Sequence, residues 1–398
     1  MRRPRLTPAI ADTRRAVRDH LRALSEGNPR ALGERSETKG PAATPPLVLV
    51  ALSGGPDSLA LAAATAFEAP RMGVNAGAVI VDHALQSGSA AVAEQAAAQA
   101  RALGLEPVLV RRASVAGRRG DDFVADSADS VPEIVTSAAS KRWAGPEAAA
   151  REARYAALAA AADETGAAAI LLAHTLDDQA ETVLLGLARG AGAASLRGMA
   201  AASGRYLRPF LGLRRATTVA ACADQGLEAW TDPMNADPAF ARVRVRQTVL
   251  PLLEETLGPG IAEALARTAG QLREDAEALD RMVDEVAEDL VSVGIDPRTE
   301  EPYPGGGISL PAGALAANPP AIRHRLIRLA VRSEFGVSLS RERTLEVTRL
   351  VTDWHGQGPI ELPGIAVRRE GEFLVFTAKQ ETAGIDADSP HGTPPIPV

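Results

Sequence analysis

The sequence predicts an α/β fold: a doubly wound parallel sheet, followed by a smaller helical and α+β domain towards the C-terminus. Two observations support the sheet. Short apolar runs alternate with helical segments of ten or more residues, the pattern of parallel strands joined by crossover helices. The runs are also apolar at nearly every position, as in strands that are buried on both faces. Ligands of such sheets bind at the carboxyl ends of the strands, so we expect functional residues just after each run.

The predicted elements follow in order along the chain. Residues 1–22 predict an amphipathic helix, because Ile10, Val17 and Leu21 recur at near-helical spacing. Strands and helices then alternate. The predicted strands are Leu47–Leu52, Ala76–Val81, Pro107–Val110 and Ala167–Ala173, and the predicted helices are Leu59–Ala66, Ala90–Leu103, Pro146–Asp163 and Asp177–Arg189.

The domain organisation follows from shifts in composition. We expect a basic helix and linker over residues 1–45, the main α/β domain over 46–257, a second domain over 258–378, and a disordered tail over 379–398 that is rich in Pro, Gly and Asp. Residues 113–144 are too long for an ordinary connection and predict an insertion in the main domain.

Composition narrows the class of protein. One cysteine, Cys222, among 398 residues cannot form an intramolecular disulfide, a CxxC pair or an iron–sulfur cluster alone. No apolar run is long enough to span a bilayer and no signal peptide is evident, so we expect a cytoplasmic protein without a membrane partner.

The net charge of -7 does not exclude a polyanionic partner, because the charges are unevenly distributed. Residues 1–36 carry nine Arg against four acids, and residues 197–250 carry eight Arg against four acids. Residues 272–301 carry eleven acids against three Arg, and this stretch accounts for much of the negative total.

The segment SGGPDS directly after the first predicted strand is the sharpest motif. Glycines let the backbone approach an anion closely, and the amides and dipole of the following helix favour negative charge. The motif therefore predicts a phosphate cradle, although an ordinary capped βα turn is the simpler alternative. It is neither a GK[ST] loop nor GxGxxG. The residues are Ser53, Gly54, Gly55, Pro56, Asp57 and Ser58.

Polar residues follow two further strands. Asp82 and His83 end the second strand, where they either flank the loop or form a turn. His174, Asp178 and Glu181 follow the fourth strand at helical spacing, so their side chains should converge. Two carboxylates without an arginine partner repel each other, which favours a cation between them, either Mg²⁺ or a substrate ammonium. Helix capping is the alternative for Asp178.

The helix predicted from Pro146 places Glu147, Arg151, Arg154 and Tyr155 on one face. This face is either solvated, with a Glu–Arg pair worth a few tenths of a kcal/mol, or functional. In the functional interpretation an arginine faces phosphates, or Glu147 contacts a cationic substrate.

Together these motifs resemble the PP-loop ATP pyrophosphatase superfamily, whose signature is SGGxDS and whose members adenylylate a substrate by releasing pyrophosphate from ATP. VDHAL at 81–85, ExxxRxxRY from Glu147 and HxxDDQxET from His174 are similar to tRNA(Ile)-lysidine synthetase and tRNA 2-thiocytidine synthetase. Residues 232–246 resemble the lysidine synthetase motif DxSNxDxxxxRNxxR, with Met234 and Val243 as departures. The thiolating enzyme needs CxxC cysteines, which this chain lacks.

The resemblance implies ATP and Mg²⁺ as co-substrate and cofactor, and free L-lysine and the isoleucine tRNA with a CAU anticodon as substrates. In that reaction ATP adenylylates the oxygen on carbon 2 of the wobble cytidine. The ε-amine of lysine then attacks carbon 2 and displaces AMP. Residues 46–257 would be the catalytic domain and 258–378 the tRNA-recognition domain. There are two alternatives. The chain could be another PP-loop enzyme that amidates or thiolates a different substrate, or an inactive nucleotide-binding protein. A homodimer is an open possibility.

The resemblance also assigns roles. The loop residues with Asp82 and His83 would bind ATP, and Asp57 would organise Mg²⁺ or the loop. Arg151 would face the phosphates or the adenylylated cytosine. Asp178, Glu181 and Glu147 would bind lysine, and His174 or a carboxylate would accept its proton. Three arginines at alternate positions are expected to follow the tRNA backbone, or else form only an exposed basic face of a strand or helix: Arg242, Arg244 and Arg246.

Overall fold

The computed structural model describes residues 6–25, 45–82, 88–112, 146–190, 192–303 and 306–379. The chain forms two compact units, residues 1–273 and 274–398. The boundary predicted from the sequence is 257/258, ahead of the long helix α10 (Ile261–Leu290). The boundary between the two units falls within that helix. The predicted insertion at 113–144 and residues 380–398 of the predicted tail lie outside the described residues.

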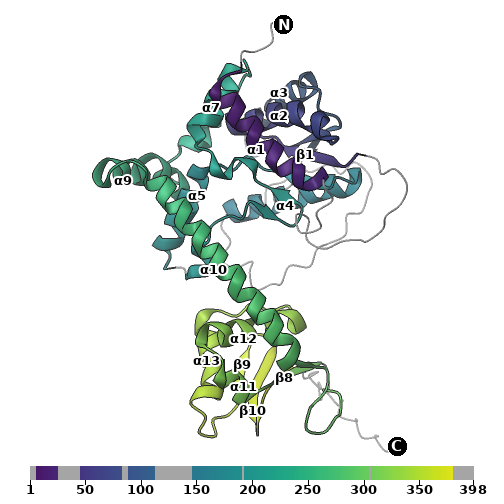
Figure 1. Ribbon diagram of the computed structural model, residues 1–398, viewed down its shortest axis with the longest axis vertical. Helices are drawn as coiled ribbons and strands as arrows, with labels where there is room; N and C mark the ends of the chain where they lie inside the picture. The colour runs from purple at the N-terminus through teal and green to yellow at the C-terminus, as the bar shows by residue number, and fades with distance from the viewer. Residues whose placement is uncertain are drawn as a thin grey trace, which may run out of the picture. The chain divides into compact units, whose positions relative to one another are not determined.

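The first unit contains a six-stranded sheet in the order β3-β2-β1-β4-β6-β5. All neighbouring strands are parallel except β5 and β6. The predicted parallel sheet is therefore confirmed, and the chain leaves β1 towards β2 on one side and returns to β4 on the other (Figure 1). The strands are β1 (Leu47–Ala51), β2 (Asn75–Asp82), β3 (Val108–Arg112), β4 (Ala169–Leu171), β5 (Ala202–Ser203) and β6 (Tyr206–Leu207).

Helices cover both faces of this sheet. Because side chains alternate along a strand, Val48 and Val50 of β1 join one core with α2 and α3, whereas Leu49 joins another core with Leu158 of α4. This arrangement explains why the strand is apolar at every position. The helices are α2 (Pro56–Glu68), α3 (Ser89–Ala102), α4 (Pro146–Thr165), α5 (Leu176–Ala188), α6 (Ala193–Leu196), α7 (Arg215–Asp224), α8 (Ala241–Arg244) and α9 (Leu250–Leu257).

The N-terminal helix α1 (Pro8–Ser25) packs on the first unit. Val17 and Leu21 are fully buried in the same core as α2. Arg18 binds both carboxylate oxygens of Glu68 at 2.8 Å, and Glu68 is only 1% exposed. The basic helix predicted over residues 1–22 thus packs on the first unit through its apolar face and through one arginine (Figure 1).

The hairpin β5–β6 extends the sheet beyond the predicted strands. Ile170 of β4 pairs with Tyr206 of β6, so β6 is parallel to β4. Each hairpin strand has only two residues, which is too short for a recognisable alternation of side chains. A short 3₁₀ turn, Pro209–Gly212, then leads into α7.

The second unit begins within α10 and contains a five-stranded antiparallel sheet in the order β7-β8-β11-β10-β9. Leu310, Leu326, Leu350, Val367 and Phe376 are fully buried in its core. The predicted smaller α+β unit is confirmed. Its elements are β7 (Ser292–Val293), β8 (Gly307–Pro311), α11 (Ala312–Ala317), α12 (Pro320–Phe335), α13 (Arg341–Thr352), β9 (Ile360–Leu362), β10 (Ile365–Glu370) and β11 (Phe373–Ala378).

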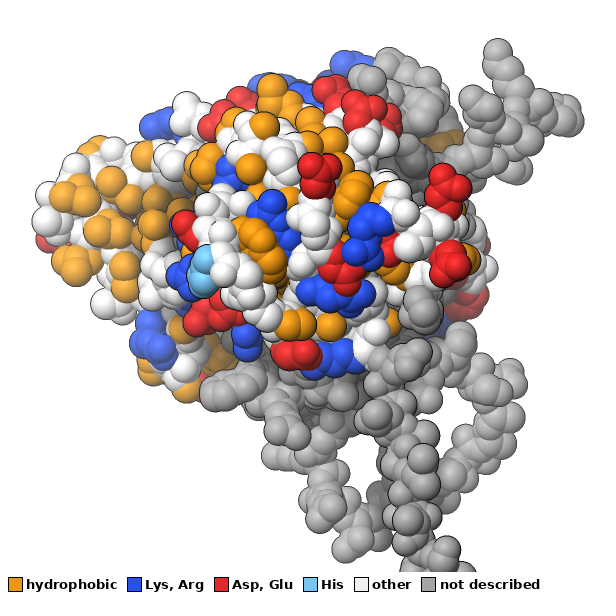
Figure 2. Space-filling view, turned by 90° about the horizontal axis from the view of Figure 1, so that it is seen from below, with side chains coloured by type: hydrophobic (Ala, Val, Ile, Leu, Met, Phe, Trp, Pro, Cys, Tyr) orange, Lys and Arg blue, Asp and Glu red, His pale blue; other side chains and the backbone are white. Residues whose placement is uncertain are grey.

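The surface carries charges of both signs. Figure 2 shows Lys and Arg side chains interspersed with Asp and Glu on the face in view, rather than one broad basic field. Within the described parts of the chain, no helix combines the length and the apolar character needed to cross a bilayer.

Candidate active site

The site lies where the strand order reverses. β1 and β4 are hydrogen-bonded neighbours, with Val50 opposite Leu171, and they run parallel. Their carboxyl ends therefore lie at the same edge of the sheet, and this switch point is where doubly wound sheets bind ligands. The loop 53–58 follows β1, and the segment that begins at His174 follows β4, so the two sharpest motifs are brought together.

The loop after β1 is a tight turn that leads into the N-terminus of α2. Gly54 has a φ of +82°, a conformation in which a side chain is strained, and Gly55 forms the N-cap of α2. Ser58 accepts a hydrogen bond from the backbone N of Ser53 at 3.2 Å and donates one to the carbonyl of Gly55 at 2.9 Å. The loop is thus held from inside, and the backbone N of Trp230 donates to the carbonyl of Gly54 at 3.0 Å.

Asp57 lies in the first turn of α2 and contacts helix α7. The hydroxyl of Thr218 donates to Asp57 Oδ1, and Nε of Arg215 lies 3.4 Å from Asp57 Oδ2. Burial raises the pKa of Asp57 above its usual range, although the hydrogen bond from Thr218 and the charge of Arg215 oppose this. The carboxylate is therefore fixed in position beside the loop by two side chains of α7.

Asp178 forms the capping box of α5. The backbone N and the hydroxyl of Thr175 each donate to Asp178 Oδ2 at 2.8 Å. Arg215 Nη2 donates to Asp178 Oδ1 at 2.6 Å. Burial alone would raise the pKa of Asp178, but Arg215 and Thr175 outweigh it and hold the pKa below its usual range. The predicted capping role is present, together with an ion pair.

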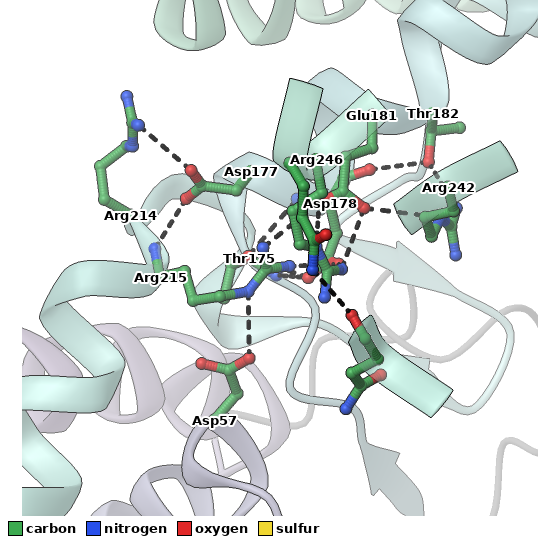
Figure 3. A network of polar contacts seen from close by, with 12 residues as sticks. Asp57, Thr175, Asp177, Asp178, Glu181, Thr182, Arg214, Arg215, Arg242 and Arg246 are labelled. Atoms are coloured by element: carbon green, nitrogen blue, oxygen red, sulfur yellow. Dashed lines mark hydrogen bonds and ion pairs between the residues drawn. The ribbon is translucent and has the colours of Figure 1, made fainter. Parts of the chain in front are cut away.

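Glu181 is fully buried and surrounded by arginines (Figure 3). Arg246 contacts both carboxylate oxygens, with Nε at 2.7 Å from Oε1 and Nη2 at 3.1 Å from Oε2. Arg215 Nη1 donates to Oε1 at 3.2 Å, and Arg242 Nε lies 3.6 Å from Oε2. A carboxylate at this depth is stable only when paired and hydrogen-bonded, and three guanidinium groups supply the pairing.

His174 lies at the end of β4 beside this cluster. Burial lowers its pKa to about 4, the charge of Asp178 opposes the shift, and nearby Arg208, Arg151 and Arg242 reinforce it. Its Nδ1 is buried and makes no hydrogen bond to any described residue. The imidazole is therefore neutral at pH 7, with a ring nitrogen that is available to a ligand.

Metal binding by protein groups alone is not supported. Among the residues that the structure describes, no three His, Cys, Asp or Glu side chains gather where they could hold a metal ion. A magnesium ion in a nucleotide site needs only one or two carboxylates, because phosphates supply the other ligands. Asp57, beside the phosphate cradle, fits that limited role.

The comparisons with known proteins show the family of the chain. A PP-loop domain family matches residues 34–253, and a TilS substrate binding domain family matches residues 310–375. A tRNA(Ile)-lysidine synthase of Leifsonia xyli subsp. xyli is 58% identical over 336 residues, which cover 84% of this chain and 91% of the relative. A tRNA(Ile)-lysidine synthase of Thermobifida fusca is 48% identical over 374 residues, which cover 92% and 98% respectively. The chain belongs to the tRNA(Ile)-lysidine synthase family.

Among solved structures, the U34-tRNA thiolase NcsA from Methanococcus maripaludis aligns with a TM-score of 0.48 and 19% identity over 67% of this chain and 79% of that chain. The resemblance to the lysidine synthase family that the motifs predicted is confirmed by the relatives above.

For this member of the lysidine synthase family, one prediction about Asp178 and Glu181 needs correction. The case for a cation between them assumed that no arginine lay beside them, but Arg215 contacts both carboxylates and so does Arg246. The chain therefore neutralises the pair itself, and a substrate ammonium would have to exchange with an arginine.

The expectation for Arg242, Arg244 and Arg246 also needs correction. Residues at alternate positions share a face only in a strand, and this segment is helical, with α8 followed by a π-helical turn at Val245–Val249. Arg242 and Arg246 both point at Glu181, whereas Arg244 donates to the carbonyls of Pro238 and Ala239. The three side chains do not form one basic surface.

The remaining predicted residues are placed as follows. Arg151 is exposed on α4, with its guanidinium 5.0 Å from the centre of the Tyr155 ring. Asp82 is 7% exposed at the end of β2, next to β1. His83 and the side chain of Glu147 lie outside the described residues.

Arg215 and Thr218 of α7 are the site residues that the sequence interpretation missed. A signal was present, since Arg214 and Arg215 stand at the start of a helix, where the dipole disfavours cations. Such a pair indicates acidic neighbours. Asp177 supplies one, because it accepts the backbone N–H of Arg215 at 2.7 Å and lies 3.1 Å from Arg214 Nη2.

Proposed function

We propose that this protein ligates lysine to carbon 2 of the wobble cytidine in the isoleucine tRNA with a CAU anticodon, consuming ATP and releasing pyrophosphate and AMP. The observation that carries the proposal is the position of Asp178 and Glu181, which a single side chain, Arg215, links to Asp57 beside the phosphate cradle. Sites for a nucleotide and for a charged amino acid thus adjoin. Membership of the lysidine synthase family supports the same reaction.

In the first step, the carbon 2 oxygen of cytosine attacks the α-phosphorus of ATP and pyrophosphate leaves. The backbone of Ser53–Ser58 and the N-terminus of α2 would hold the phosphates, and Asp82 and His83 would flank the nucleotide. Mg²⁺, held by the phosphates and Asp57, would offset charge on the leaving pyrophosphate. Arg151 would face the phosphates or the adenylylated base.

In the second step, the ε-nitrogen of lysine attacks carbon 2, and the bond to the AMP oxygen breaks. Asp178 and Glu181 would bind the charged groups of lysine together with Glu147, and Arg246 is suited to the lysine carboxylate. The ε-ammonium must lose a proton before its lone pair can attack. His174 is neutral and has a buried nitrogen that makes no hydrogen bond to the described residues, so it is a candidate acceptor alongside the carboxylates.

The tRNA would present its cytidine as an unstacked base. The second unit supports this role, since residues 310–375 match the TilS substrate binding domain family. A homodimeric active form is a further prediction, which sedimentation of the purified protein would test.

The test is a reaction with radiolabelled lysine, ATP and tRNA transcripts. Lysidine, AMP and pyrophosphate should form only with the CAU isoleucine transcript, and a transcript with a changed wobble base is the matched control. Asp57→Ala and Glu181→Ala proteins that are shown to be folded should be inactive. If both formed lysidine at the wild-type rate, the assignment of the site would be wrong.

A further inference from the structure

Arg215 contacts both halves of the site (Figure 3). Its Nε faces Asp57 at 3.4 Å, its Nη2 faces Asp178 at 2.6 Å, and its Nη1 faces Glu181 at 3.2 Å. Asp57 belongs to the phosphate-binding motif, and the other two carboxylates belong to the proposed lysine site. One planar guanidinium therefore joins two motifs that are more than 120 residues apart in the sequence.

The charges of this cluster balance without a ligand. Three carboxylates face three arginines, Arg215, Arg242 and Arg246. A lysine ammonium at Asp178 and Glu181 adds a positive charge, which a partly buried cluster accommodates only if another cation moves away. Arg246 is held at 2.7 Å and 3.1 Å by Glu181, and Arg242 also donates to Thr182 at 3.1 Å. Neither of them contacts Asp57. Of these three arginines, Arg215 is therefore the one that also reaches the motif after β1.

Resting on the function proposed above, we propose that Arg215 couples the two substrates. Without nucleotide, its guanidinium occupies the place of the lysine ammonium at Asp178 and Glu181. When ATP phosphates bind in the Ser53–Ser58 loop, they draw the guanidinium towards the phosphates, and the two carboxylates become free to bind lysine. Nucleotide binding thereby raises the affinity for lysine.

The geometry permits this exchange with little backbone movement. The backbone N–H of Arg215 is fixed by Asp177 at 2.7 Å, and Thr218, one turn later in α7, donates to Asp57. The start of α7 is thus anchored on both sides, while the Arg215 side chain is 21% exposed and reaches both motifs. Guanidinium groups bind phosphate oxygens in bidentate geometry, so the phosphates are strong competitors for it.

A purely structural clamp would behave differently. If Arg215 only held α2, α5 and α7 together, its removal would weaken folding and the binding of both substrates without altering how one substrate affects the other. An exchanging counter-ion contributes a coupling free energy instead. By linkage, lysine must then raise the affinity for nucleotide by the same factor that nucleotide raises the affinity for lysine.

The experiment is calorimetric titration of the full chain with L-lysine, with and without saturating Mg²⁺ and α,β-methylene ATP, which cannot release pyrophosphate. For the wild type we expect the analogue to tighten lysine binding by about tenfold or more, within the usual range of coupling. For Arg215→Met we expect the two lysine affinities to differ by less than about twofold, because lysine no longer competes with an arginine.

Two variants serve as controls. Arg246→Met removes the cation proposed to bind the lysine carboxylate, so it should weaken lysine binding. Because Arg246 does not contact Asp57, the effect of the analogue should persist. Arg214→Met makes the same change at the neighbouring residue and should keep the wild-type ratio. If Arg215→Met does not fold, Arg215→Lys is measured instead, and its ratio should fall several-fold below that of the wild type.

A wild-type protein whose lysine affinity is the same with and without the analogue would overturn the inference, and so would an Arg215 variant that retains the full ratio. The proposed function is tested separately by lysidine formation with the CAU transcript. An active wild type without coupling refutes only the role of Arg215, whereas a wild type that makes no lysidine refutes the function itself.

Discussion

The guanidinium of Arg246 holds both carboxylate oxygens of Glu181, at 2.7 Å and 3.1 Å, and Glu181 is fully buried. A bidentate pair of this kind sets the position of both side chains. It also directs the guanidinium of Arg246 to Glu181, so a substitution of this arginine should act first on the carboxylate cluster.

We expect Arg246→Ala to raise the KM for lysine by about tenfold or more, in line with the roughly 1.5–3 kcal/mol of a hydrogen bond to a charged group. The KM for tRNA should change little. Steady-state kinetics with each substrate varied in turn measures both constants. Arg244→Ala is the control, because Arg244 donates to the carbonyls of Pro238 and Ala239 rather than to Glu181. A raised KM for tRNA with an unchanged KM for lysine would contradict the placement.

We expect Glu181→Ala to lower the free energy of unfolding by about 3 kcal/mol, because it leaves buried guanidinium groups without their partner. Urea denaturation at pH 7 measures the loss. The matched control is Glu94→Ala, which removes an exposed Glu–Arg pair to Arg101 of similar length, 2.9 Å. That change should cost less than about 1 kcal/mol. Equal losses at both positions would show that Glu181 is not the buried centre of the cluster.

We expect Gly54→Ala to abolish nucleotide binding. Gly54 has a φ of +82°, so a side chain costs roughly 1–2 kcal/mol in backbone strain and distorts the loop. Gly73 is the control, because it has a φ of +66° and, among the described residues other than its chain neighbours, no atom lies within 4 Å of the place that an alanine methyl group would take. Gly73→Ala should destabilise the protein by a similar amount yet still bind ATP, which fluorescence titration with a labelled nucleotide would measure. Intact binding by Gly54→Ala would exclude the loop as the cradle.

We expect stability to fall as the pH drops from about 6.5 towards 4. Burial lowers the pKa of His174 to about 4, so between these values the unfolded chain binds a proton that the folded chain does not. His174 thus destabilises the fold in acid, by at most about 3.4 kcal/mol at 1.36 kcal/mol per pH unit. Urea denaturation at pH 7 and pH 5 should show a smaller loss for His174→Gln than for the wild type. An equal loss would mean that the imidazole is solvated.

The sequence was sufficient for the framework of the fold. The continuous apolar runs predicted β1, β2 and β4 to within one or two residues at most ends, because burial on both faces leaves a pattern that few other structures share. The two-residue strands β5 and β6 leave no such pattern. The motifs after β1 and β4 were placed correctly because the topology of a parallel sheet brings those ends together.

The partners within the site were harder to predict. Glu181 and Asp178 were recognised by their spacing on one helix, which is a local property. Arg215 reaches them from α7. Two arginines at a helix start indicate acidic neighbours, but they do not identify which carboxylates these are. Arg242 and Arg246 were expected to follow a tRNA backbone because they alternate along the sequence, and that spacing does not show that both contact Glu181.

The chain's lone thiol lies on the same helix as Arg215 and Thr218. Cys222 is 2% exposed, and burial, with the charge of Asp57 adding to it, raises its pKa to about 11. A thiol this protected reacts with an alkylating reagent only while α7 is lifted away from the core. The rate at which Cys222 is labelled therefore measures how often α7 opens, and this measurement needs no substitution.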